Sequence, residues 1–247
     1  MTLIIALKCK EGNIIASDGR IVVLDEYRSD QKIYKISEGV LVGLAGSTGV
    51  IKRIVRRLSE LNISSLSSDE EVEKVEKALA EIYKYHRGVY GDNFASKEDF
   101  DRQFYGSMLA IDKENIYKFF FDGYPEPCGD YEAIGSASGY VRTLIEGLYD
   151  GEMDIQRGLE LACYCILQAM KVSRDIGEPI QLGSAKGGEG AKILDQQAVE
   201  EIVKKMNGRE RVLRDVWNII SRDPKLQEEI EEWIRGKTSS LAKRQSV

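Results

Sequence analysis

Residues 2–18, TLIIALKCKEGNIIASD, contain two short apolar runs separated by the charged segment KEG. Apolar runs of this length, broken by charged residues and a glycine, are typical of a β-hairpin. We therefore expect two antiparallel strands at 2–9 and 13–18, and their pairing would return Asp18 to the side of Thr2.

The segments that follow change from strand to helix. A second hairpin is expected at 32–36 and 39–43, where apolar stretches lie on either side of a short turn. Apolar residues at intervals of three and four between 47 and 58 then indicate a helix. A cluster of serines and an aspartate before residue 70 would cap a second helix at 69–88.

The second half of the chain repeats this order of hairpins and helix pairs. The expected elements are strands at 105–112, 115–121 and 131–134, helices at 138–149 and 154–173, a hairpin within 179–195 and a charged helical stretch at 196–240. Because the strands arrive in hairpin pairs, we expect an α+β fold built as a four-layer αββα sandwich, in which helix pairs cover two antiparallel sheets. Residues 1–205 would form this domain, and residues 206–247 would form a helical C-terminal extension.

The composition is that of a soluble globular protein, and it disfavours both a membrane protein and a nucleic-acid-binding protein. The 247 residues are 43% hydrophobic and 31% charged. No run approaches the roughly 20 apolar residues of a bilayer-spanning helix. The net charge of −6 disfavours nucleic acid as the main partner, because phosphate binding needs a basic surface. The four cysteines form no CxxC pair and the chain shows no secretory leader pattern, which points to the cytoplasm.

The residues that usually build metal sites and catalytic triads are scarce. His86 is the one histidine and lies in a polar helical stretch, so we expect it at the surface and expect no Ser/His/Asp triad. Cys163 and Cys165 are two apart in a predicted helix and would face different directions. We therefore expect no metal and no cofactor, and a hydrolytic reaction must take its base from elsewhere.

Thr2 could supply both nucleophile and base once removal of Met1 makes it the first residue. Its hydroxyl would attack, and its own α-amine, with an ordinary pKa of about 8, would accept the proton. Asp18 and Lys32 would lie beside it, where a lysine stabilises a developing alkoxide and lowers the pKa of the amine. The alternative for this pair is an ordinary surface ion pair, which contributes little.

Six segments in order resemble 20S proteasome β subunits and their bacterial relative HslV. The opening TLIIAL, the stretch GNIIASDGR at 12–20 and KIYKI at 32–36 are similar to the start of those proteins. VGLAG at 42–46 is similar to the turn before their first helix, AIGS at 133–136 to their GSG segment, and SRD at 173–175 to the end of their fourth helix. The resemblance spans roughly residues 2–205 and implies an N-terminal-nucleophile hydrolase with threonine peptidase activity.

The resemblance implies roles for four residues near the start of the chain. Thr2 would be nucleophile and base, and Asp18 and Lys32 would orient and charge the site. Gly43 would offer its backbone N–H to the oxyanion of the tetrahedral intermediate.

Further residues follow from the same resemblance. Ser136 and Asp175 would hydrogen-bond around the Thr2 amine. Ile21, Leu41 and Ala45 would line the pocket for the residue before the cleaved bond and would favour an apolar side chain there. The substrate would be a peptide or an unfolded protein that binds in an extended form.

Three features depart from the family pattern. Glu178 stands where relatives have a small residue near the amine, often serine, and the segment STG at 47–49 replaces their aspartate after the turn. Residues 206–247 extend past the usual end and carry an apolar stripe with Trp217 and Trp233. A cap on the domain's own surface and a partner interface are the two interpretations of this stripe.

The leading hypothesis is a threonine-type endopeptidase in a homo-oligomeric ring, with α-type ring subunits as further candidate partners. One alternative is a diverged homologue that acts as a transpeptidase or protein ligase, as archaeal proteasome-related ligases do. Another is a non-catalytic ring subunit in which Thr2 stays unexposed. An α-type subunit is disfavoured, because such subunits carry a helical extension ahead of a first strand that here begins at Thr2.

Overall fold

The structure is a computed structural model that describes residues 2–23, 26–104, 106–220, 228–230, 232–233 and 235. Met1, Tyr105 and most of the predicted helical stretch after residue 220 lie outside the described residues. The chain divides into two compact units, residues 1–203 and 204–247. Among the described residues, no helix is long and apolar enough to cross a membrane.

The first sheet is antiparallel and contains the N-terminal hairpin. Strand β1 lies between β10 and β2, with Leu3 opposite Gly135 and Ile4 opposite Ser17. This register puts the end of β2 beside the start of β1, as the sequence predicted. The strand order is β10 (Tyr131–Gly135), β1 (Leu3–Cys9), β2 (Gly12–Ser17), β11 (Gln181–Lys186) and β12 (Gly190–Ile193).

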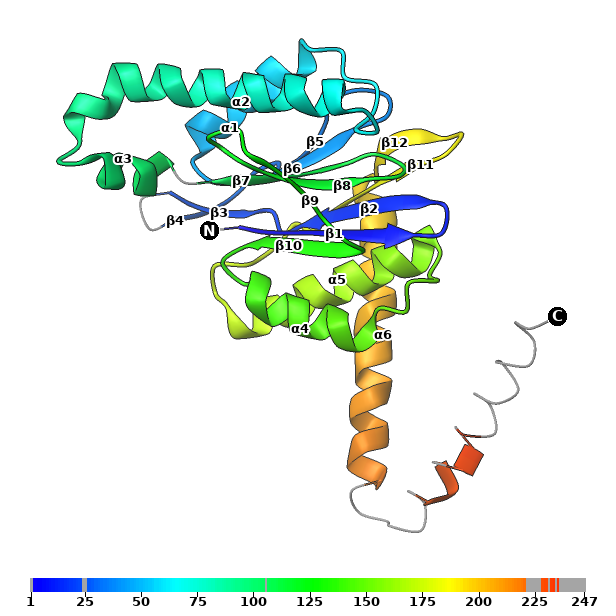
Figure 1. The fold of residues 1–247 in the computed structure, drawn as a ribbon. Coiled ribbons are helices and arrows are strands. Elements are labelled where there is room, and N and C mark those ends of the chain that lie inside the picture. Colours follow the sequence, from blue (N-terminus) through cyan, green and yellow to red (C-terminus); the bar gives the residue numbers. More distant parts are fainter. Residues whose placement is uncertain are drawn as a thin grey trace. The chain divides into compact units, whose positions relative to one another are not determined.

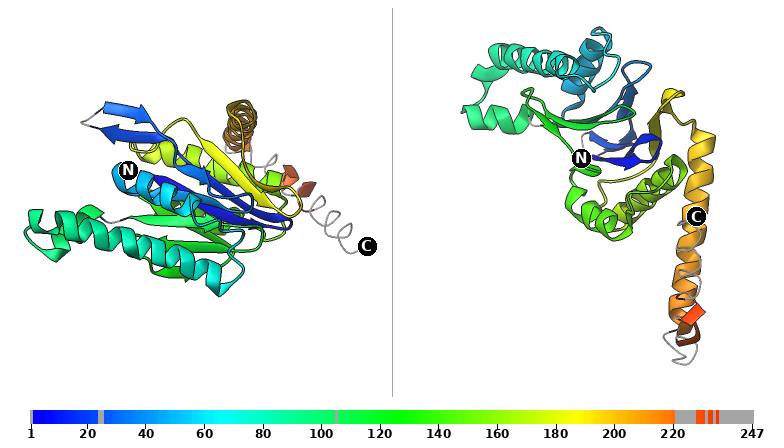
Figure 2. Two further views of the ribbon diagram at one scale, coloured as in Figure 1. Left: turned by 90° about the horizontal axis from the view of Figure 1, so that it is seen from above. Right: turned by 45° about the vertical axis from the view of Figure 1, so that its right-hand side comes forward.

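The second sheet is also antiparallel and grows from the second predicted hairpin. Its order is β5 (Ile33–Lys35), β6 (Leu41–Ala45), β7 (Ser107–Ile111), β8 (Ile116–Phe120) and β9 (Pro125–Pro127). A separate hairpin of β3 (Arg20–Val23) and β4 (Glu26–Ser29) reaches out from the two larger sheets (Figure 2). The sequence did not predict β3, β4 or β9 as strands.

Helices α1 and α2 cover the outer face of the second sheet (Figure 1). Ile54 and Leu79 from these helices form one buried cluster with Leu44 of β6. Ser68 caps α2 as expected, because its side chain accepts a hydrogen bond from Glu71 N. The elements in this layer are α1 (Thr48–Ser59), α2 (Asp69–Tyr90), the 3₁₀ turn η1 (Gly91–Asn93) and α3 (Lys97–Phe104).

His86 on α2 is half-buried, which corrects the expectation that it lies at the surface. Helix α3, which the sequence did not predict, brings the ring of Phe104 to within 5.1 Å of the His86 ring centroid. Arg53 Nη1 lies 3.4 Å from His86 Nε2. Burial, and secondarily the Arg53 cation, lower the pKa of His86 below its ordinary value of 6.5.

Helices α4 (Ser138–Leu148) and α5 (Ile155–Val172) cover the outer face of the first sheet (Figure 1). Helix α5 lies across β1 and β2, and Gly158 allows the close approach. A Cβ at Gly158 would stand 2.5 Å from Cys9 Sγ and 3.4 Å from Ile14 Cγ1. Helix α6 (Gln196–Ile220) follows β12.

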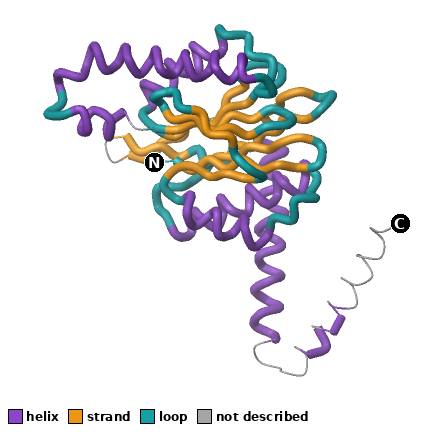
Figure 3. The backbone as a smooth tube through the Cα atoms, in the orientation of Figure 1, coloured by secondary structure: helices purple, strands orange, loops and turns teal. Residues whose placement is uncertain are grey.

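The two sheets face each other across an apolar interior. Ile4 and Ile15 of the first sheet form one buried cluster with Leu41 and Leu109 of the second. Figure 3 shows the strands gathered between the helices of the two outer layers. The predicted four-layer αββα sandwich is confirmed.

Candidate active site

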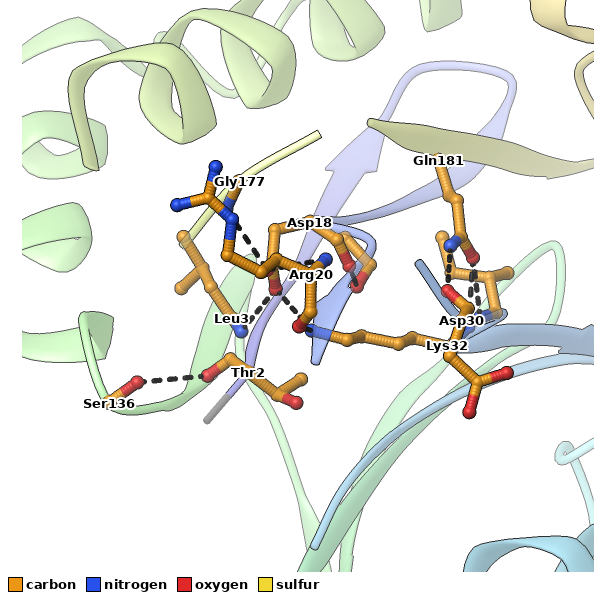
Figure 4. A network of polar contacts seen from close by, with 11 residues as sticks. Thr2, Leu3, Asp18, Arg20, Asp30, Lys32, Ser136, Gly177 and Gln181 are labelled. Carbon is orange, nitrogen blue, oxygen red and sulfur yellow. Dashed lines mark hydrogen bonds and ion pairs between the residues drawn. The ribbon is translucent and has the colours of Figure 1, made fainter. Parts of the chain in front are cut away.

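Thr2 is held where β1 begins, against the end of β10. The residue is 9% exposed, and its carbonyl oxygen accepts a hydrogen bond from Ser136 N at 3.0 Å. Gly135 permits this approach, because its φ is +101° and a Cβ there would collide with the carbonyl of Thr2. The turn after β10 therefore fixes the Thr2 backbone from one side, as Figure 4 shows.

Asp18 follows β2 directly and is completely buried. Its Oδ1 atom accepts hydrogen bonds from Leu3 N at 2.9 Å and from Lys32 Nζ at 2.8 Å. Its Oδ2 atom accepts from the backbone N–H groups of Arg20 at 3.2 Å and Gly177 at 3.3 Å. Four donors thus satisfy a carboxylate that has no access to water.

Lys32 precedes β5 and reaches Asp18 from the second sheet (Figure 4). Its Nζ atom donates to Asp18 Oδ1 at 2.8 Å and to the carbonyl of Arg20 at 2.6 Å, and its side chain is 3% exposed. Its backbone N–H donates to Gln181 Oε1 at 2.9 Å. Burial lowers the pKa of Lys32 below 10.5, although Asp18 opposes this shift. The alternative of a surface ion pair is therefore wrong, because both charges are buried.

A pocket of about 560 Å³ opens beside Thr2. Ala45 lines this pocket, together with Gly46 at the end of β6. The other two residues predicted to line it, Leu41 and Ile21, are not among its lining residues. Leu41 belongs to the apolar interior between the sheets, and Ile21 lies on β3 opposite Arg28. Among the described residues, no group of three or more His, Cys, Asp or Glu side chains is arranged to hold a metal ion.

Residues 2–184 match the family model described as "Proteasome subunit". The chain belongs to the proteasome subunit family. This match confirms the resemblance drawn from the sequence, and it covers every residue that has just been placed around Thr2.

Known members of the proteasome family and their structural relatives extend the comparison. A proteasome subunit alpha of Methanocaldococcus jannaschii is 30% identical, over 82% of this chain and 76% of its own length. A proteasome subunit beta of Methanocaldococcus fervens is 22% identical, over 85% and 92%. The structure of Anbu, an ancestral beta-subunit from Yersinia bercovieri, shares the fold with a TM-score of 0.68 at 15% identity, over 88% of this chain and 97% of that one.

Gly43 is not among the residues that line the pocket beside Thr2, so the pocket gives no support to the oxyanion role implied for it. It lies in β6 between Ile33 and Leu109 of the neighbouring strands. Leu44 N donates to the carbonyl of Lys32, so the alternation of an antiparallel strand turns the N–H of Gly43 the other way, toward β7. Gly43 is instead a packing glycine, since a Cβ there would stand 2.5 Å from Ile4 Cγ2.

Gly46 is the glycine of this proteasome-family turn that lines the pocket. The sequence VGLAG offers two glycines, and their order along the chain did not distinguish them. Of the two, Gly46 lines the pocket and Gly43 does not.

The hydrogen bonds predicted for Ser136 and Asp175 around the free amine of Thr2 stay predictions. In the structure Ser136 donates to the carbonyl of Thr2, through its N–H at 3.0 Å and its hydroxyl at 3.5 Å. Asp175 is half-buried after α5, and within the described chain no hydrogen bond joins it to Thr2. Glu178, which replaces the small residue of the family, has an exposed side chain.

Two residues that hold the Asp18 and Lys32 pair were missed by the sequence analysis. Gly177 donates its N–H to Asp18 and accepts at its carbonyl from the N–H groups of Gly19 at 3.0 Å and Arg20 at 3.2 Å. Gln181 positions the start of β5 through Lys32 N. Gly177 acts through its backbone alone, so its side-chain type carried no signal of this role.

Proposed function

We propose that this chain is a threonine-type endopeptidase of the proteasome family, with Thr2 as nucleophile once it is the first residue. The observation that carries the proposal is the buried pair of Asp18 and Lys32, held beside the start of β1 by the hydrogen bond from Leu3 N to Asp18. A buried charge pair needs several further hydrogen bonds to persist, and a chemical role accounts for keeping it at this place.

The reaction begins when the free α-amine of Thr2 takes the proton of its own Oγ1 atom. Oγ1 then bonds to the carbonyl carbon of a peptide, and the resulting oxyanion accepts a hydrogen bond from the N–H of Gly46. The peptide C–N bond breaks as the ammonium returns the proton to the leaving nitrogen. Water, deprotonated by the same amine, hydrolyses the ester and restores Thr2.

Lys32 supports this cycle through its charge. Its ammonium favours the alkoxide that develops on Thr2 Oγ1 and lowers the pKa of the nearby α-amine, so that more of the amine is unprotonated at neutral pH. Asp18 holds that ammonium at 2.8 Å and, by accepting from Leu3 N, also holds the first residue of the strand that follows Thr2.

The enzyme would work in the cytoplasm as part of an assembly. Its relatives are named as alpha and beta subunits of the proteasome. We propose a homo-oligomeric ring, with α-type ring subunits as partners and unfolded protein as substrate.

A second candidate is a structural ring subunit without activity. Two observations favour it: Thr2 is only 9% exposed, and several relatives are alpha subunits. In that case the Asp18 and Lys32 pair serves to join the two sheets.

Intact-mass spectrometry with a threonine-reactive β-lactone tests the proposal. We expect protein that begins at Thr2 to gain the mass of one lactone. Thr2→Ala should gain none, and Thr143→Ala, which removes an exposed threonine on α4, should react like the parent chain. If Met1 is retained, methionine aminopeptidase exposes Thr2 before labelling. A chain that begins at Thr2 and forms no adduct would overturn the proposal in favour of the structural subunit.

A further inference from the structure

The pocket beside Thr2 has an unusual lining for a site expected to take apolar side chains. Among its lining residues are two cations and no carboxylate. Hydroxyl groups face it as well. The charged and hydroxyl-bearing residues that line it are Lys118, Arg142, Thr2, Ser107, Ser136 and Ser138.

Lys118 is held at the pocket by a carboxylate from the neighbouring strand. It lies on β8 opposite Glu126 of β9, and its Nζ atom is 2.8 Å from Glu126 Oε2. The same ammonium lies 4.8 Å from the ring centroid of Phe120, which also lines the pocket. Its side chain is 16% exposed, so the charge sits largely out of bulk water.

Arg142 is also held by a carboxylate, that of Glu132 on β10 in the first sheet. It lies on α4, and its Nε atom donates to Glu132 Oε1 at 2.9 Å while Nη2 donates to the carbonyl of Ala133 at 2.7 Å. Glu132 also accepts from Ala133 N at 2.7 Å, so its carboxylate is fixed.

The two carboxylates support the cations without lining the pocket. Neither Glu126 nor Glu132 is part of the lining, whereas Lys118 and Arg142 are. A substrate group in the pocket therefore meets two positive charges whose counter-ions are not part of the lining. An apolar group there would desolvate both charges without replacing their hydrogen bonds with water, which is unfavourable.

We propose that this pocket selects an acidic side chain of the substrate, with Lys118 and Arg142 as the residues that determine specificity. The inference rests on the proposed peptidase function and names its substrate class. A glutamate or aspartate next to the cleaved bond would form charge-assisted hydrogen bonds with the two cations. Glutamine, which has nearly the same shape but no charge, would bind less tightly.

The binding test uses the full chain with Thr2→Ala, so that it does not depend on catalysis. The probes are two fluorescent peptides, acetylated and amidated at their ends, that differ only in one central residue, glutamate or glutamine. We expect the glutamate peptide to bind about tenfold more tightly, the size expected of a hydrogen bond to a charged group. The difference should shrink with added salt.

Variants in the same background identify the cations. Lys118→Met combined with Arg142→Met should abolish the preference for glutamate, and Lys118→Arg should keep it. Lys10→Met removes a surface lysine that pairs with Glu152 and should change nothing. Thermal unfolding of each variant checks that the fold is intact. Equal binding of the two peptides, no binding of either, or a preference that survives the double variant would each overturn the proposal.

Labelling with an uncharged β-lactone separates this inference from the proposed function. If the chain that begins at Thr2 forms the adduct but the two peptides bind alike, the peptidase proposal stands and the acidic preference is wrong. If no adduct forms and the glutamate preference is present and depends on the two cations, the pocket binds acidic peptides in a protein that does not cleave them.

Discussion

The ammonium of Lys32 lies 2.8 Å from the carboxylate of Asp18, at a place where the two side chains are 3% and 0% exposed. One residue comes from the edge of the second sheet and the other from the end of β2 in the first. Their contact therefore joins the two sheets by charge, beside the apolar cluster that lies between them.

Removal of one partner of this pair should be strongly destabilising. Lys32→Met leaves the carboxylate of Asp18 buried and without its counter-ion, and we expect the free energy of unfolding to fall by about 3–5 kcal/mol. Urea denaturation followed by circular dichroism measures this. Lys10→Met, on an exposed pair, should lose less than about 1 kcal/mol.

The double variant Asp18→Asn with Lys32→Met provides the control. Because it removes both charges, it should lose less stability than Lys32→Met alone. A loss in Lys32→Met no larger than that of the exposed pair would contradict the buried position of these charges.

Gly43→Ala tests whether this glycine is needed for packing. Its new Cβ would stand 2.5 Å from Ile4 Cγ2 and 3.0 Å from Ile15 Cδ1, and we expect a loss of about 1–3 kcal/mol in the free energy of unfolding. Gly49→Ala in α1 is the matched control, because nothing lies within 4 Å of its Cβ. It should stabilise the chain by up to about 1 kcal/mol. Equal effects of the two changes would count against the packing role.

His86 should titrate below pH 6.5, the ordinary value for histidine. Because the folded pKa is lowered, the unfolded chain binds this proton at a higher pH than the folded chain does. The stability contributed by the neutral ring is thus complete above pH 6.5 and is lost as the pH falls through the folded pKa. As this is the one histidine in the chain, its ring protons give a single titration curve by NMR. Arg53→Met should raise the measured pKa, and a curve centred above 6.5 would refute the burial.

The cysteine thiols should resist alkylation in the folded chain. Burial raises the pKa of Cys9, Cys128, Cys163 and Cys165 to about 12 in each case, against an ordinary value of 9.0. At pH 8 this lowers the thiolate fraction by roughly a thousandfold. Iodoacetamide followed by mass spectrometry should therefore find no rapid modification until denaturant is added, when all four thiols react. Prompt labelling of Cys163 in native protein would argue against the packing of α5.

Much of this fold could be predicted because its core elements carry regular apolar patterns. The apolar runs of β1 and β2 predict strands from the local sequence alone, and the apolar spacing of three and four in α1 predicts a helix in the same way. Strand β9 could not be predicted in this way, since prolines at both of its ends fit only an edge strand. Helix α3 is short and mostly charged, so its amphipathic pattern is brief.

The site likewise contains residues that the sequence could predict and residues that it could not. Asp18 and Lys32 could be predicted because their side-chain types carry the chemistry and a hairpin brings one of them to Thr2. The choice between Gly43 and Gly46 depends on which of them lines the pocket beside Thr2, and that follows only from how the strands pack in three dimensions.

The bond from Gly177 N to Asp18 spans 159 positions of the sequence. During synthesis on the ribosome, Thr2 and Asp18 emerge early, but Gly177 and Gln181 emerge only when most of the domain has been made. The surroundings of the first residues therefore remain incomplete until translation has nearly finished the sandwich. The nucleophile that we propose would therefore lack part of its surroundings while its own chain is still growing.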